Sequence, residues 1–158
     1  MCGDGVAVNP VNAFKLFMKA AEQNDPRAQY EVAEMYRQGL GVDESQKSAN
    51  KWYEKSAELG NAQAQVAWAK RLDEGTGMFF SDHDAAYQWY LKAAQQGQGE
   101  AYYILGVMAY DGRRVRMSLD DAYHLFQAAK KTGYFNSDLE RRLKVCERFI
   151  KSKNSYGK

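Results

Sequence analysis

The stretch WYEKSAELG, at residues 52–60, decides the fold because the chain repeats it. It recurs as WYLKAAQQG at residues 89–97 and, more weakly, as LFQAAKKTG at residues 125–133, at steps of 37 and then 36 residues. LFMKAAEQN, at residues 16–24, precedes the first copy by 36 residues. Self-similarity at a fixed step is the signature of a repeat architecture, so the sequence predicts an array of similar units.

A second block keeps the same step and completes the unit. AQYEVAEMYRQGLGV starts at Ala28, AQVAWAKRLDEGTGM at Ala64 and AYYILGVMAYDGRRV at Ala101. Apolar residues in both kinds of block recur at helical spacing, so each unit is predicted to be an antiparallel pair of helices, A and B. The A helices are predicted near residues 26–38, 62–74 and 99–111, and the B helices near 11–23, 45–59, 82–96 and 118–132.

The repeats predict one solenoid over residues 1–152. Its parts are a half repeat at 1–25 whose first helix is missing, full repeats at 26–61, 62–98 and 99–134, and a capping helix at 135–152. The cap is predicted because Leu139, Leu143, Cys146, Phe149 and Ile150 form an apolar stripe where the repeat register is lost. Residues 153–158 are predicted to be a disordered tail.

Large and small residues alternate along the predicted helices. Small residues recur at fixed places in the repeats, and two helices approach closely only where their side chains are short. Four large residues are expected to fill the space between successive helix pairs: Tyr36, Trp52, Tyr53 and Trp89. Both tryptophans are therefore expected to be buried.

The composition is that of a globular chain of about one domain. Of its 158 residues, 45% are hydrophobic and 27% are charged, which excludes an acidic disordered tail or a low-complexity segment. No apolar run is long enough to span a bilayer, and the mean hydropathy is −0.67. Cys2 and Cys146 lie at opposite ends, so neither a disulfide framework nor a zinc site is indicated.

The two motif blocks together resemble the Sel-one-like repeat family, relatives of the tetratricopeptide repeat. The resemblance covers residues 28–60, 64–97 and, more loosely, 101–133. The chain departs from the family pattern at Ala33 and Ala69, which replace a glycine, at Arg114, which replaces a loop glycine, and at Leu125 and Phe126, which replace Trp-Tyr. The resemblance implies an all-α, right-handed α/α solenoid that presents a concave surface to a protein partner. It also implies an adaptor without catalysis of its own, in a family with many bacterial and exported members.

The sequence offers no constellation for catalysis or for metal binding. Its two histidines, His83 and His124, lie apart from any other strong ligand set. The string SDHD at residues 81–84 is typical of a helix N-terminus, where acidic residues are favoured by the helix dipole. We therefore expect no catalytic, cofactor-binding or metal-binding residue, no cofactor and no enzymatic activity.

The expected function is protein interaction, through the inner face of the array. By analogy with tetratricopeptide arrays, this face consists of A-helix positions that avoid the packing residues. Its tyrosines, valines and charges of both signs suit a peptide, helix or protein partner held by aromatic anchors and a polar rim. The predicted residues are Arg27, Tyr30, Glu34, Arg37, Gln63, Val66, Lys70, Asp73, Glu100, Tyr103, Val107 and Tyr110, with a secondary loop site at Arg113, Arg114 and Arg116. Tyr30, Tyr103 and Tyr110 are expected to be partly exposed on one surface, unless they merely cover it.

Two other functions remain open at this stage. Some similar repeats act as bacterial immunity or inhibitor proteins that block a toxin. Alternatively, residues 112–158, which carry 12 Lys and Arg against 5 Asp and Glu, could contact nucleic acid, although a solvated basic face gives the same count. We expect a monomer with no small-molecule substrate. The cytoplasm is slightly favoured, and a periplasmic or exported location would require a signal upstream that has been removed.

Overall fold

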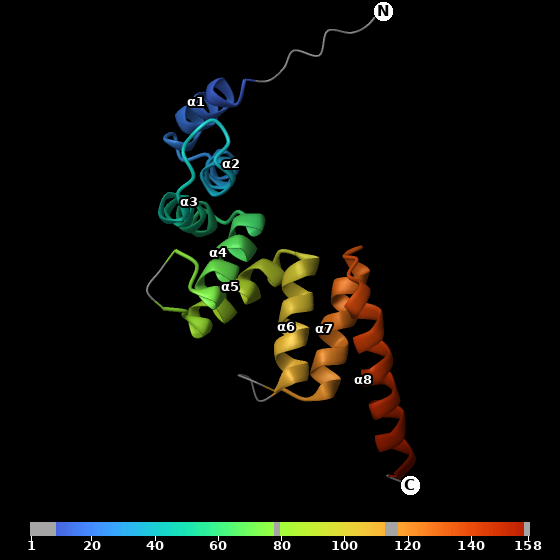
Figure 1. Cartoon of the computed structure of the whole chain (residues 1–158). Coiled ribbons are helices and arrows are strands. Elements are labelled where there is room, and N and C mark those ends of the chain that lie inside the picture. The colour runs from blue at the N-terminus through green and yellow to red at the C-terminus, as the bar shows by residue number, and fades with distance from the viewer. Residues whose placement is uncertain (1–8, 78–79, 113–116, 157–158) are drawn as a thin grey trace, which may run out of the picture. The chain divides into compact units, whose positions relative to one another are not determined.

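A computed structural model describes residues 9–77, 80–112 and 117–156, and these residues form α-helices joined by short loops, without a β-strand (Figure 1). The all-α prediction is therefore confirmed for this part of the chain. The helices are α1 (Pro10–Ala21), α2 (Pro26–Gln38), α3 (Gln46–Glu58), α4 (Ala62–Glu74), α5 (His83–Gln95), α6 (Gly99–Asp111), α7 (Leu119–Lys131) and α8 (Ser137–Tyr156).

The chain divides into two compact units, Met1–Ala86 and Tyr87–Lys158, and the division falls within α5. In the first unit α1 packs on α2, α2 on α3, and α3 on α4. In the second unit α6 packs on α7, and α7 on α8. The predicted order of A and B helices is therefore present, with α2, α4 and α6 as A helices and α1, α3, α5 and α7 as B helices.

Local signals in the sequence set the helix ends. Asp25 caps α2 by accepting hydrogen bonds from the backbone N–H groups of Arg27 and Ala28, at 2.8 and 3.1 Å. Gly39 ends α2 in the left-handed conformation, with a φ of 68°. Gly41 follows at a φ of 70°, and a Cβ there would lie 2.1 Å from the carbonyl oxygen of Pro10. Glycine is therefore required where the loop after α2 crosses the start of α1.

The core differs from the prediction at the tryptophans. Trp52 and Trp89 are only partly buried, and lysine ammonium groups one turn further on lie over their rings, at 4.7 and 3.9 Å from the centroids. The expectation that both are buried is wrong. The prediction is confirmed for Tyr53, which is 1% exposed, and the equivalent Tyr90 is 2% exposed, as is expected of a ring that faces inward between helices.

Helix α8 packs through the first half of the predicted stripe. Leu139, Leu143 and Cys146 are buried in a cluster with α7 residues, whereas Phe149 is exposed. The helix also continues to Tyr156, so residues 153–156 of the predicted tail are helical. Ile150 is partly buried, and Lys153 still reaches Asp120 at the start of α7, at 3.4 Å, so Phe149 is exposed although α8 lies beside α7 there.

Candidate partner-binding surface

The first unit fixes its candidate residues through the carboxylate of Glu34 on α2. This carboxylate accepts hydrogen bonds from Nε and Nη2 of Arg37, at 3.0 and 2.6 Å, from Nε2 of Gln38 at 2.8 Å, and from the hydroxyl of Tyr53. Burial by itself would raise the pKa of Glu34, but these hydrogen bonds outweigh it and hold the pKa below its usual value. Glu34 is therefore a charged centre that orients Arg37 on the helix face.

Tyr30 lies one turn before Glu34 and is only partly buried. Its ring packs on the ring of Tyr53, with centroids 5.9 Å apart. Burial, and then the charge of Glu34, raises the pKa of Tyr30 above its ordinary value. A partly exposed tyrosine held by a buried ring is a suitable anchor for a partner.

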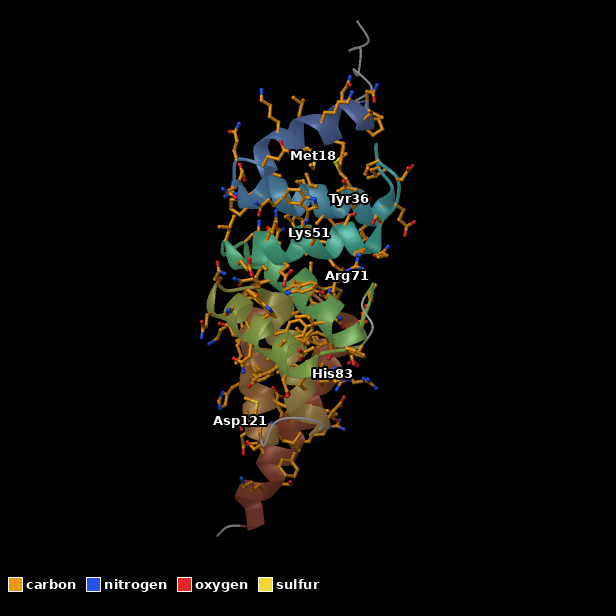
Figure 2. All side chains as sticks on the ribbon, turned by 90° about the vertical axis from the view of Figure 1, so that its left-hand side faces the viewer. Met18, Tyr36, Lys51, Arg71, His83 and Asp121 are labelled. Carbon is orange, nitrogen blue, oxygen red and sulfur yellow. The ribbon has the colours of Figure 1, made fainter. Side chains whose placement is uncertain are left out.

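Helix α4 contributes a cation to the same neighbourhood. The guanidinium of Arg71, labelled in Figure 2, lies 5.5 Å from the centroid of the Tyr53 ring and donates to Oε1 of Gln46 at 2.6 Å. Sequence reasoning missed Arg71 because the repeat register alone gives no sign that its side chain reaches α3. Val66, in contrast, is 4% exposed, so it belongs to the core and we leave it out of the surface.

The second unit has a matching arrangement between α6 and α8. The hydroxyl of Tyr103 donates to Oδ2 of Asp138 at 3.1 Å, and the guanidinium groups of Arg141 and Arg142 also donate to this carboxylate. Hydrogen bonds from Arg142 and then from Arg141 lower the pKa of Asp138 to about 2. Burial, with a further contribution from Asp138, raises the pKa of Tyr103.

Tyr110 stands beside a depression on this unit. Arg142 lies over its ring at 5.0 Å from the centroid and forms an ion pair with Asp111 at 3.5 Å. The depression, of about 260 Å³, is lined by Tyr110, Asp111, Arg141, Arg142 and Val145. Its walls combine an aromatic ring, an exposed valine and two guanidinium groups. That combination suits a peptide with an apolar side chain next to a carboxylate or carbonyl oxygen.

The structure distributes the predicted residues over the two units. Arg27 and Gln63 are exposed, and nine further residues are partly exposed: Tyr30, Glu34, Arg37, Lys70, Asp73, Glu100, Tyr103, Val107 and Tyr110. In the first unit Arg37 is joined to Glu34, and the Tyr30 ring packs on Tyr53. The three tyrosines have the expected partial exposure, but they are divided between the two units, so their position on one surface stays a prediction. Arg113, Arg114 and Arg116 lie outside the described residues.

Ser81, His83 and Asp73 form a hydrogen-bonded series in the first unit. Ser81 Oγ lies 3.1 Å from His83 Nε2, and His83 Nδ1 lies 2.7 Å from Asp73 Oδ1. Acyl transfer also needs donors for an oxyanion and an enclosed site. The histidine and aspartate side chains here are each about a third exposed, so the series is open to water. We interpret it as a clamp that ties the start of α5 to the end of α4.

The described part of the chain contains neither a candidate metal site nor a candidate membrane-spanning helix. Within it, no three His, Cys, Asp or Glu side chains are grouped so that they could hold a metal ion. No helix there is both long enough and apolar enough to span a membrane.

A loss of the Asp138 charge is expected to destabilise the second unit in a pH-dependent way. Because the pKa of Asp138 is lowered from 3.8 to about 2 on folding, its stabilisation is complete above about pH 4 and is lost as the pH falls toward 2. Asp138→Asn should therefore unfold more easily than the wild type at neutral pH, with a difference that vanishes near pH 2. Urea titrations over this range measure it. Asp43→Asn, at an exposed aspartate, is the control, and an equal pH dependence in both variants would contradict the assignment.

A protein-family model described as Sel1 repeat matches residues 1–25, 26–61, 62–98 and 99–134. The chain belongs to the Sel1 repeat family. Sel1 repeats are typical protein-interaction modules. Together with the helices described above, the match confirms the predicted fold class, an all-α solenoid of Sel1-type helix pairs.

Individual proteins resemble the chain along most of its length. It is 27% identical over 156 residues to Chitin synthase regulatory factor 3 of Schizosaccharomyces pombe, a match that covers 98% of this chain and 16% of that protein. The crystal structure of a Sel1 repeat protein from Oxalobacter formigenes is 32% identical, with a TM-score of 0.78 over 85% of this chain and 38% of that one. The crystal structure of c5321, a protective antigen of uropathogenic Escherichia coli strains, is 25% identical, with a TM-score of 0.76 over 87% of this chain and 29% of that one. The chain thus spans less than half the length of each of these relatives.

Proposed function

We propose that the chain is a non-catalytic adaptor that binds a peptide, helix or protein partner on the A-helix faces of its two units. The proposal rests on the partial exposure and the packing of the tyrosines on α2 and α6. Tyr30, Tyr103 and Tyr110 are partly exposed, and each packs against a buried aromatic ring, Tyr53 or Phe126. Their orientation is therefore fixed before a partner arrives, which lowers the entropy lost on binding.

The charges around these tyrosines support a protein partner. Arg37 and Arg142 are oriented by carboxylates, so they present guanidinium N–H groups in fixed directions. Tyrosine and arginine are enriched at binding hot spots, and fixed donors suit the carbonyl and carboxylate oxygens of a polypeptide. The relative from Schizosaccharomyces pombe is named a regulatory factor of an enzyme, which is the kind of role that an adaptor serves.

Truncation of a tyrosine anchor tests the proposal. The partner is first captured from cells with the intact chain as bait and identified by mass spectrometry, and its dissociation constant is then measured with purified variants. Tyr110→Ala or Tyr30→Ala should weaken binding by about 2 kcal/mol, close to thirtyfold, with a small change in melting temperature.

Two matched variants control this experiment. Lys131→Ala removes an exposed side chain from α7, on a B helix, and should bind like the wild type. Tyr103→Phe removes only the hydroxyl that donates to Asp138, so it separates packing from polar contact. Normal partner affinity in both alanine variants would refute the proposed surface, and unfolding at a much lower temperature would show that these tyrosines act in the core.

A further inference from the structure

Helix α8 is strongly basic. It contains six lysines and arginines but only three acidic residues. Two of the acids are already paired, Asp138 with Arg141 and Arg142, and Glu140 with Lys130 at 2.8 Å. The positive charge of α8 therefore exceeds the negative charge that its own residues supply.

Four cations of α8 are exposed: Arg141, Lys144, Arg148 and Lys151. Lys144, Arg148 and Lys151 have no ion pair or side-chain hydrogen bond within the described part of the chain. The side chain of Arg141 is 74% exposed and donates to Asp138 only through Nε and Nη2. Its third nitrogen, Nη1, is thus left to an acceptor from another molecule, as are the three lone cations.

An apolar surface lies between two of these cations. Val145 is 41% exposed and lines the depression of about 260 Å³ together with Tyr110. It follows Arg141 by four residues and precedes Arg148 by three, so the three side chains share one face of α8. Along the helix axis the two cations lie about 6 Å and about 4.5 Å from Val145. The face therefore reads as cation, apolar residue, cation.

This side of α8 differs from the faces through which the helices of the chain pack on one another. Those faces consist of buried small residues around one buried aromatic ring, as in Ala86 and Tyr90. Burial of Arg141 and Arg148 against such a face would remove two charges from water without a partner, which is strongly unfavourable. The face suits a partner that brings carboxylates with it.

We propose that α6 and α8 bind an acidic segment of a partner protein in which a large apolar residue stands between carboxylates. The apolar residue occupies the depression beside Tyr110 and Val145, and the carboxylates before and after it pair with Arg141 and Arg148. This inference rests on the proposed function, because it names the chemistry of the partner at the second unit. Opposite charges speed the encounter and fix the register, and the buried apolar residue supplies most of the affinity.

Nucleic acid is the other polyanion that a basic face can attract. Proteins hold single strands by stacking bases on the faces of aromatic side chains. At the depression, however, the guanidinium of Arg142 lies over the Tyr110 ring, 5.0 Å from its centroid, where a stacked base would have to lie. The exposed Val145 wall suits an aliphatic side chain. The depression therefore favours a polypeptide.

Short fluorescein-labelled peptides test the proposal on the full chain, by fluorescence anisotropy. The probe has the central sequence Glu-Asp-Glu-Leu-Glu-Asp-Glu, and the wild type should bind it. Replacement of its leucine by serine should weaken binding by at least about tenfold, because an apolar side chain no longer becomes buried. A probe with lysines in place of its acidic residues should not bind. Added salt should weaken the binding of the acidic probe, since the pairs with exposed cations are screened.

Charge variants locate the site on α8. Arg148→Glu should weaken binding of the acidic probe by about fivefold or more, because it replaces an attraction by a repulsion. Arg148→Gln removes only the charge and should weaken binding less. Since Arg148 is exposed and lacks a partner in the described residues, both variants should keep the melting temperature of the wild type, which circular dichroism checks. Lys51→Glu makes the same charge change on α3, in the first unit (Figure 2), and should bind the probe normally.

Three results would overturn the proposal. The acidic probe does not bind the wild-type chain, or Arg148→Glu weakens its binding no more than Lys51→Glu does. In the third, an oligothymidylate of equal charge binds more tightly than the probe and is released by Arg148→Glu, so that α8 is a nucleic-acid surface. The proposed function is tested separately, because the partner captured from cells can still depend on Tyr30 of the first unit when the acidic probe does not bind.

Discussion

Tyr53→Ala is expected to lower the free energy of unfolding by about 3–5 kcal/mol, whereas Trp52→Ala should cost clearly less. The Tyr53 ring is 1% exposed and is enclosed by Tyr30, Glu34 and Arg71, so its removal leaves a cavity and breaks the hydrogen bond to Glu34. Trp52 is partly exposed, and solvent can occupy part of the space that it leaves. Urea denaturation followed by circular dichroism measures both values.

Tyr53→Phe is the control for this comparison. It keeps the ring and removes only the hydroxyl, and Glu34 retains its hydrogen bonds from Arg37 and Gln38. The variant should therefore cost about 1 kcal/mol, a typical value for one hydrogen bond. If Trp52→Ala proved more destabilising than Tyr53→Ala, the tryptophan would be the core residue after all.

The residue types in the four copies already distinguish the Trp52 position from the Tyr53 position. The first position of the pair is Leu16, Trp52, Trp89 and Leu125 in the four copies, so it accepts an aliphatic residue. The second position is Phe17, Tyr53, Tyr90 and Phe126, which are aromatic in every copy. A site enclosed by helices on several sides has a fixed volume and accepts side chains of similar size. The size of a tryptophan side chain does not by itself predict that it is buried, because a large side chain can also lie flat on the outside of a helix pair.

The helix boundaries follow from the sequence because local interactions set them. The predicted A helices, at 26–38, 62–74 and 99–111, coincide with α2, α4 and α6, and Gly39, Gly75 and Gly112 end these helices in the left-handed conformation. Asp25 caps α2 and Asn61 caps α4, and such a cap or a terminal glycine acts within one helical turn. Such signals are legible without knowledge of the tertiary structure.

The candidate surface follows from the sequence only in part. The repeat register puts Tyr30, Val66 and Tyr103 at one A-helix position, but Val66 is 4% exposed whereas the two tyrosines are partly exposed, so the register alone does not decide exposure. Asp138 and Arg142 could not be placed, because they belong to α8, where the repeat pattern is lost and the sequence gives no register for the contact with Tyr103 and Tyr110. Contacts between residues about 35 positions apart depend on how the helices pack, and a periodic pattern describes only one helix at a time.

The last prediction concerns Gly106, the residue of α6 that faces the Phe126 ring. A Cβ at this position would lie 2.6 Å from Cε1 and 2.7 Å from Cδ1 of the ring, and the ring is 0% exposed. Because the ring is fully buried, it cannot move aside into solvent. Gly106→Leu is therefore expected to lower the free energy of unfolding by about 3 kcal/mol, although leucine favours the helix more than glycine does.

A double-mutant cycle with Phe126→Ala measures whether this cost arises from the ring. Phe126→Ala alone should be destabilising because it leaves a cavity at the centre of the α6 and α7 pair. In the double variant the leucine side chain can enter that cavity, so the combined loss of stability should be smaller than the two separate losses by about 1–3 kcal/mol. Met108→Leu, a change of similar volume at a partly exposed residue of α6, should be close to neutral. Strictly additive losses would contradict the close packing of Gly106 on the ring.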